Sequence, residues 1–315
     1  MDQQVARGKH GHTRVDTPVS TPPPTPTPAT AAAQDLYREI KTIYQQLAPL
    51  PSLAPCDLVN ALLTRLVTIC IQPCSPDVVD HFHRLDAAAT LCHNLQNLCA
   101  IAEGELERHW AHKTLQDAGP HPNPLRTRTL LATFPYHANY LSLSHLEASL
   151  LTPFLTHPPS TIAFIGSGPL PLTSLCLLAH FPTATITNID RDADALAVSS
   201  ALTEKLGYAD RMTFACEDAA DASGGRTDWE AFDVVFLAAL VGMRSPEKVG
   251  VLRGLRGRLR VGTVVVCRSA RGMRGVLYPV LELSEELQGA GFEVLAELHP
   301  WNGVVNSVVV LRVKA

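Results

Sequence analysis

Residues 164–180 read FIGSGPLPLTSLCLLAH, which joins the end of an apolar strand to a glycine turn and then to an apolar helix. Gly166, Ser167 and Gly168 form the turn, where glycine lets the backbone bend sharply and approach a ligand closely. The N-terminus of the following helix favours an anionic group such as a carboxylate. Position 171 is Pro instead of the third glycine of a dinucleotide fingerprint. The stretch therefore predicts a small-molecule site in an α/β sheet, without a pyrophosphate site.

Short β-branched runs alternate with helical stretches on both sides of this turn. The runs are 161–166, 184–190, 212–218, 233–240, 263–270, 292–299 and 304–313. They predict a doubly wound, mostly parallel sheet of seven strands, ending in an antiparallel hairpin across residues 300–303. This α/β architecture resembles the Rossmann-like domain of methyltransferases that depend on S-adenosylmethionine (SAM). At fold level the resemblance implies SAM as ligand, but it does not determine the reaction.

The chain divides into three parts. Residues 1–32 contain the tract TPPPTPTP and few large aliphatic side chains, which predicts a disordered or polyproline-like tail. Residues 33–157 carry apolar residues at helical spacing, interrupted by prolines, and predict an all-helical N-terminal domain of about five helices. Residues 158–315 form the predicted SAM-binding domain.

Composition and charge favour neither nucleic-acid binding nor membrane binding, although they exclude neither. The net charge is −4, and 46% of the residues are hydrophobic, which is typical of a globular protein without electrostatic attraction to nucleic acid or membranes. The longest apolar run, 234–243, is shorter than the ~20 residues that span a bilayer. The polar first residues do not resemble a secretory signal, so we expect a cytoplasmic location. The 8 cysteines form no CxxC pair, which predicts reduced core thiols and no metal site.

Two strand-terminal acids are candidates for binding an adenosine group. Asp190 follows Gly168 by 22 residues, close to the ~20-residue spacing at which an acid accepts hydrogen bonds from ribose hydroxyls. Asp192 is a nearby alternative. Asp218 ends the third run and is placed to accept from the adenine amino group, with Glu217 expected to point the other way. A helix cap or a surface charge is the other interpretation of each acid.

Several segments together resemble the nicotianamine synthase family. They are FIGSGPLPLTS (164–174), DVVFLAALVGM (233–243), AEGELERH (102–109), FPYHANY (134–140), RSA (268–270), LYP (277–279) and VVNSV (304–308). The resemblance extends from about Leu36 to the C-terminus. It implies that three SAM molecules are condensed by transfer of their 3-amino-3-carboxypropyl groups, giving nicotianamine, which chelates transition metals, and three methylthioadenosines. SAM is then the substrate, and no other cofactor is expected.

The resemblance also implies roles for residues of the helical domain. Glu107 is the expected general base, with Glu103 on the same helical face and Glu105 pointing away. Tyr136 is expected to orient the substrate, and Tyr140, four residues later, to bind it. A solvated helix face and core packing are the alternative interpretations of the acids and the tyrosines.

The C-terminal domain contributes the remaining candidates. Arg268 is expected to bind a substrate carboxylate. Ala238 is assigned to the adenosine site, and Asn306 receives no role. Two other functions stay open: a small-molecule N-methyltransferase on the same fold, which would release S-adenosylhomocysteine, and a SAM-binding protein without turnover.

Overall fold

A seven-stranded sheet forms the C-terminal half of the chain in a computed structural model, which describes residues 27–315 except 122 and 222–224. Its strands are β1 (Thr161–Ile165), β2 (Thr185–Asp190), β3 (Met212–Cys216), β4 (Val234–Leu237), β5 (Val264–Ser269), β6 (Phe292–Leu298) and β7 (Ser307–Val313). The order is β3-β2-β1-β4-β5-β7-β6. The first five strands are parallel, and β7 lies antiparallel between β5 and β6. The predicted fold class and the antiparallel terminal hairpin are therefore confirmed.

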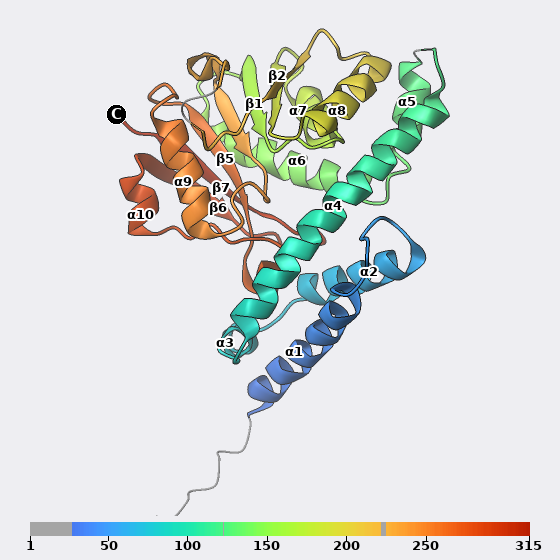
Figure 1. Cartoon of the computed structure of the whole chain (residues 1–315). Coiled ribbons are helices and arrows are strands. Elements are labelled where there is room, and N and C mark those ends of the chain that lie inside the picture. Colours follow the sequence, from blue (N-terminus) through green and yellow to red (C-terminus); the bar gives the residue numbers. More distant parts are fainter. Residues whose placement is uncertain (1–26, 122, 222–224) are drawn as a thin grey trace, which may run out of the picture.

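Alternation along each strand sends neighbouring side chains to opposite faces of the sheet. In β1, Ile162 and Phe164 pack in the core beneath α6 (His137–Leu151) and α7 (Leu172–His180). Ala163 and Ile165 pack in the other core, beneath α9 (Ser245–Arg256) and α10 (Glu285–Gly289). Figure 1 shows these two helical layers on either side of the sheet. Both faces are covered, as the continuous apolar runs require.

Six α-helices precede the sheet in the described part of the chain, compared with about five expected. They are α1 (Pro28–Leu47), α2 (Asp57–Ile71), α3 (Pro76–His83), α4 (Ala88–Ala118), α5 (Pro124–Leu131) and α6. Helix α1 begins earlier than residue 33, because Thr27 caps its N-terminus, Pro28 occupies the first turn and alanines follow. Residues 28–32 are thus helical, and the rest of the predicted disordered tail lies outside the described residues.

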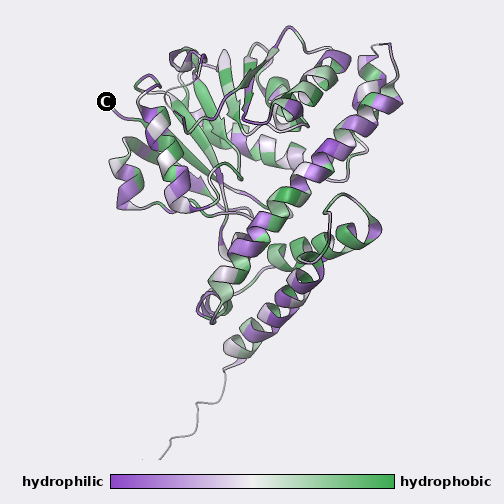
Figure 2. Cartoon of the chain, viewed as in Figure 1, coloured by the Kyte–Doolittle hydropathy of each residue, from purple (hydrophilic) through white to green (hydrophobic). Residues whose placement is uncertain are grey.

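Helix α4 crosses from one end of the molecule to the other. Its first half, with Leu91 and Leu95, packs against α1, α2 and the turn at residues 272–276. Its second half, with Ala111, packs against α5 and α8 (Ala193–Leu206). Apolar side chains face different partners along its length, and Figure 2 shows hydrophobic and hydrophilic residues alternating along this helix. Its middle turns pass the carboxyl ends of the sheet strands (Figure 1).

The contacts do not follow the predicted division at residue 157. Helix α6 lies before that boundary, yet Leu143 and Leu151 belong to the core of the sheet. Conversely, Met273 and Leu277 follow β5 but pack into the core of the N-terminal helices. Each half of the chain therefore contributes side chains to the core of the other half. The exact domain boundaries stay a prediction.

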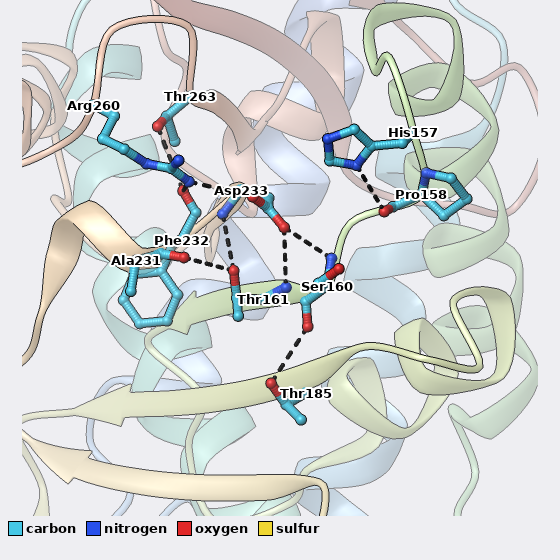
Figure 3. Close-up of polar contacts among 10 residues, drawn as sticks. All are labelled: His157, Pro158, Ser160, Thr161, Thr185, Ala231, Phe232, Asp233, Arg260 and Thr263. Carbon is cyan, nitrogen blue, oxygen red and sulfur yellow. Dashed lines mark hydrogen bonds and ion pairs between the residues drawn. The ribbon is translucent and has the colours of Figure 1, made fainter.

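Asp233 fastens the amino ends of β1 and β4 (Figure 3). One carboxylate oxygen accepts hydrogen bonds from the backbone N–H groups of Ser160 and Thr161 at 2.8 and 3.2 Å, and the other accepts one from Arg260 at 3.3 Å. Partial burial alone would raise the pKa of Asp233, but these bonds outweigh it and bring the pKa below 3.8. This acid lies at the edge of the sheet opposite the glycine turn, so we assign it to stability.

No helix among the described residues is both long and apolar enough to cross a membrane. Cysteines 70, 92, 176 and 267 are buried, whereas Cys56 and Cys216 are exposed. The prediction of core thiols was thus wrong for those two. Both lie at element ends, Cys56 at the N-cap of α2 and Cys216 at the end of β3, where the chain leaves the core.

Candidate active site

The glycine turn adopts the conformation that the sequence predicts. Gly166 and Gly168 have φ of 76° and 62°, in the left-handed region that favours glycine. A Cβ on Gly166 would lie 2.5 Å from Cγ2 of Val241, in the loop after β4, and 3.1 Å from Cβ of Ala238. The turn and this loop therefore pack together because residue 166 has no side chain.

Asp190 holds the turn from the neighbouring strand. Its Oδ2 accepts a hydrogen bond from the N–H of Gly168 at 2.9 Å, and its Oδ1 accepts one from the N–H of Asp192 at 3.0 Å. Asp192 caps α8 through the N–H groups of Asp194 and Ala195, and it pairs with Arg108 of α4 at 3.0 Å. Asp192 thus caps a helix, and both Asp190 and Asp192 border the open space above the turn.

A cavity of about 640 Å³, here called the larger cavity, lies at the carboxyl ends of the strands. Every residue predicted to bind the adenosine group borders it: Gly166, Ser167, Gly168, Asp190, Asp218 and Ala238. Glu217 borders it too, contrary to the expected alternation, because β3 ends at Cys216 and the next residues are no longer pleated. Oε1 of Glu217 accepts hydrogen bonds from the N–H groups of Arg226 and Thr227 and so holds a loop. Asp218 is exposed, and its contact with the adenine amino group stays a prediction.

A second cavity of about 290 Å³, here called the smaller cavity, lies between the N-terminal helices and the sheet. Its lining is mostly apolar and includes Leu63, Val67 and Phe134. Five residues border both cavities: Glu103, Glu107, Tyr140, Arg268 and Asn306. The two cavities therefore meet at a boundary made of two acids, a phenol, a guanidinium and an amide.

The two acids of the boundary lie one turn apart on α4, as the spacing predicts. The hydroxyl of Tyr140 donates to Oε1 of Glu107 and lies 3.5 Å from Oε1 of Glu103. The hydroxyl of Tyr278 donates to Oε2 of Glu103 at 2.8 Å. Glu105 instead pairs with Arg108 on the outer side of the helix and is partly exposed. Glu103 and Glu107 are thus held by tyrosines from two other parts of the chain.

The surrounding protein changes the acidity of this pair. Desolvation, followed by repulsion from Glu103, raises the pKa of Glu107 to about 8, although Tyr140 and Arg268 act in the opposite direction. Desolvation also raises the pKa of Glu103. A carboxyl group with its pKa near neutrality can accept a proton from an ammonium group and release it again.

Arg268 of β5 is buried at the boundary, but its charge is already paired. Nε and Nη2 donate to the two carboxylate oxygens of Glu147 at 2.7 and 3.0 Å, and Nη2 also donates to Thr173. Burial opposes the charged form, yet Glu147 raises the pKa of Arg268 above its ordinary value. The bidentate edge that was expected to bind a substrate carboxylate is therefore occupied by Glu147, and among the guanidinium nitrogens only Nη1 has no hydrogen bond to these residues.

The two tyrosines that the sequence paired both border the smaller cavity, but their contacts differ. Tyr136 borders only the smaller cavity, and its ring packs edge-on against Phe134 with centroids 6.0 Å apart. Tyr140, by contrast, touches both acids. Sequence reasoning missed Tyr278, Glu147 and Asn306. Tyr278 and Asn306 stood in the motifs LYP and VVNSV, which were the available signals, whereas Glu147 stood in none.

In the described part of the chain, no group of three or more His, Cys, Asp or Glu side chains is arranged to hold a metal ion. Two acids can bind or deprotonate an ammonium group, while an amide and one guanidinium nitrogen can bind a carboxylate. An amino acid group fits this combination.

Known proteins point to the same family from two directions. The family described as nicotianamine synthase protein matches residues 29–315. Nicotianamine synthase 3 of Oryza sativa subsp. indica is 44% identical over 284 residues, which cover 89% of this chain and 78% of that protein. Nicotianamine synthase 9 of Hordeum vulgare is 43% identical over 284 residues, covering 88% and 78%.

Solved structures agree at the level of the fold. The crystal structure of MtNAS in complex with MTA and tNA superposes with a TM-score of 0.72 over 90% of this chain and 98% of that one, at 21% identity. A mutant of MtNAS in complex with S-adenosylmethionine superposes with a TM-score of 0.71, at 23% identity. The match of the family over residues 29–315 and the identity to the plant enzymes confirm the resemblance carried by the motifs: the chain belongs to the nicotianamine synthase family.

Proposed function

We propose that this chain condenses three SAM molecules into nicotianamine and releases three molecules of methylthioadenosine. The observation that carries the proposal is the pair of cavities that meet at Glu103 and Glu107. A methyltransferase needs one pocket for SAM and a site for the methyl acceptor. Here the larger cavity has the predicted adenosine-binding groups, and the smaller one extends beyond the acids with room for an amino acid chain.

In each transfer, SAM occupies the larger cavity with its sulfonium towards the boundary. The neutral α-amino group of the acceptor attacks the methylene carbon that joins the aminocarboxypropyl group to sulfur. The new C–N bond forms as the C–S bond breaks, and the bonding electrons stay on sulfur. Methylthioadenosine leaves as a neutral thioether and needs no acid. The acceptor nitrogen then carries an extra proton.

Glu107 is the proposed base for that proton. Its raised pKa brings it close to the ~7.7 to 8.0 of an ordinary α-amino group, so the transfer between them is nearly balanced in free energy. Tyr140 orients the carboxylate, and Glu103 stabilises the ammonium group of a substrate. Tyr136, on the wall of the smaller cavity, is placed to contact the growing product.

A sulfonium offers three carbons to a nucleophile, so the outcome depends on which carbon lies in line at ~3 to 3.5 Å. The adenosine groups of the larger cavity hold one end of SAM. An acid pair and a donor pair at the boundary suit its amino acid end. We therefore attribute the choice of the aminocarboxypropyl carbon to attachment of SAM at both ends.

Incubation of the purified protein with SAM alone, followed by mass spectrometry, tests the proposal. We expect methylthioadenosine and nicotianamine in a ratio of about three to one. Release of S-adenosylhomocysteine would show methyl transfer and overturn the proposal. Intact SAM after long incubation would leave a binding protein, or an enzyme whose first acceptor is a different amino acid, and addition of candidate amino acids separates these two.

Two further expectations rest on the same proposal. The product carries several amines and carboxylates and would chelate transition metals, so metals would enter through the product. The cytoplasmic location expected from the sequence also stays a prediction.

A further inference from the structure

Asn306 has a buried amide group that nothing in the described chain uses. The residue is 7% exposed, and its Nδ2 has no hydrogen-bond partner among the described residues. A buried donor without a partner costs about 1 to 3 kcal/mol. Asn306 lies immediately before β7, in a segment of valines where an apolar residue would avoid that cost. A ligand that accepts a hydrogen bond from this amide would remove that cost.

The position of Asn306 narrows the chemistry of that ligand. Ser307, the next residue, pairs with Ser269 at the carboxyl end of β5, beside Arg268. Asn306 thus joins Glu103, Glu107, Tyr140 and Arg268 at the boundary of the two cavities. Its side chain borders both cavities, and a half-turn about the terminal bond exchanges the positions of the amide oxygen and nitrogen.

The charges at the boundary decide which part of an amino acid group Asn306 contacts. An ammonium group is attracted to Glu103 and Glu107, which leaves the carboxylate to the donors. Arg268 is largely committed to Glu147, so it offers a single guanidinium nitrogen. The amide of Asn306 is the other donor at the boundary without a protein partner in the described residues.

We propose that Asn306 binds the α-carboxylate of the SAM molecule whose aminocarboxypropyl group is transferred. This inference rests on the proposed function. The carboxylate and the sulfonium are joined by three carbons, so a contact at the carboxylate and a second contact at adenosine place the reacting methylene between them. Asn306 is then a specificity-determining residue, because it helps to present this carbon in preference to the methyl group.

Three ligands separate a direct contact from a structural effect. SAM carries the carboxylate, decarboxylated SAM lacks only that group, and methylthioadenosine lacks the whole amino acid part. Calorimetry gives the Kd of each for the wild type and for Asn306→Ala. Loss of a hydrogen bond to a charged group weakens SAM binding by roughly tenfold to a hundredfold. We expect that loss for SAM, little change for decarboxylated SAM, and none for methylthioadenosine.

Asn139→Ala is the matched control. Asn139 borders only the smaller cavity, and its Nδ2 already donates to the carbonyl of Gly303 at 2.8 Å. We expect the ratio of the SAM and decarboxylated SAM affinities to stay at the wild-type value in this variant. A second variant, Asn306→Asp, keeps the size of the side chain and places a carboxylate against the ligand's carboxylate, so it should weaken SAM binding at least as much as Asn306→Ala.

The proposal is overturned if Asn306→Ala binds SAM as tightly as the wild type does, or if it loses affinity for SAM and decarboxylated SAM equally. An equal loss for all three ligands, including methylthioadenosine, would mean that Asn306 only supports the fold. Failure of the proposed function would look different, because the wild-type protein itself would then bind SAM without releasing methylthioadenosine.

Discussion

Oε2 of Glu107 lies so close to the glycine turn that a Cβ placed on Gly168 would be 2.8 Å from it. The carboxylate comes from a helix of the N-terminal half and the glycine from the loop after the first strand. The carboxylate of Glu107, the proposed base, therefore lies against the glycine turn, and each restricts the position of the other.

Gly168→Ala should separate them. The new methyl group must displace Glu107, and Ala at φ of 62° adds strain of about 1 to 2 kcal/mol. Since a displacement of 1 Å at a reacting group can cost ~10²-fold in rate, we expect kcat/KM for SAM to fall by about that factor. Steady-state release of methylthioadenosine measures it. Gly289→Ala is the control, because nothing lies within 4 Å of a Cβ there and its φ is ordinary; an equal loss in both variants would contradict the argument.

Glu107→Gln should abolish transfer and leave SAM binding intact. Glutamine keeps the shape of the side chain but cannot accept the proton of the acceptor. In the wild type only the ionised carboxylate acts, so kcat should rise about tenfold per pH unit below the pKa of about 8 and level off above it. Stopped assays from pH 6 to 9.5 give the profile. Glu105→Gln, on the outer side of the same helix, should keep both rate and profile, and an undiminished turnover in Glu107→Gln would remove this residue from the mechanism.

Lys248 holds the loop after β4, which borders the larger cavity. This fully buried residue donates from Nζ to the carbonyl oxygens of Ala239 and Val241 at 2.6 and 2.7 Å, and of Ala238 at 3.3 Å. These residues belong to the loop that packs against Gly166. Burial lowers the pKa of Lys248 to about 8, although the nearby Cys267 acts in the opposite direction. The ammonium group therefore holds the shape of a loop that borders the larger cavity.

Lys248→Met should raise the Kd for SAM by roughly tenfold or more, since each carbonyl left without a donor costs about 1 to 3 kcal/mol. In the wild type, the affinity should fall as the pH rises through about 8, because the neutral amine loses one donor, and the variant should lack this dependence. Calorimetry at pH 7 and pH 9 measures both. Lys205→Met is the control, since its Nζ also donates to two carbonyls, of Gly119 and Pro120, but away from both cavities; the same loss of affinity there would contradict a local role.

Asp233→Asn should lower stability without changing catalysis. Loss of the charge weakens the hydrogen bonds from Ser160, Thr161 and Arg260, which we expect to cost about 1 to 2 kcal/mol of unfolding free energy at pH 7. Because the folded pKa is depressed, this stabilisation exists above the unfolded pKa and disappears as the pH falls through the folded value. Urea unfolding should therefore show a smaller difference in stability between the wild type and the variant at pH 3 than at pH 7. A changed KM for SAM would contradict the assignment to stability.

The sequence predicted those parts of the fold and site that depend on local patterns. All seven strands follow from β-branched runs, and Glu103 and Glu107 follow from helical spacing. The backbone turn at Ala87, between α3 and α4, could not be predicted, because no sequence pattern indicates that this alanine has a φ of 63°. The contacts of Tyr278 with Glu103 and of Glu147 with Arg268 join residues 175 and 121 positions apart. Such pairings depend on how the helices pack on the sheet, which no single segment encodes.

The anchoring of α4 in two separate cores has a consequence for the lengths that this helix tolerates. Each residue of an α-helix advances the chain by about 100° around the axis and 1.5 Å along it. Both ends are fixed, by Leu91 and Leu95 on one side and by Ala111 on the other. A single insertion between them would rotate either the two acids or one anchoring face into solvent. The number of residues from 91 to 111 is thus constrained, and insertions and deletions should be tolerated only outside this stretch.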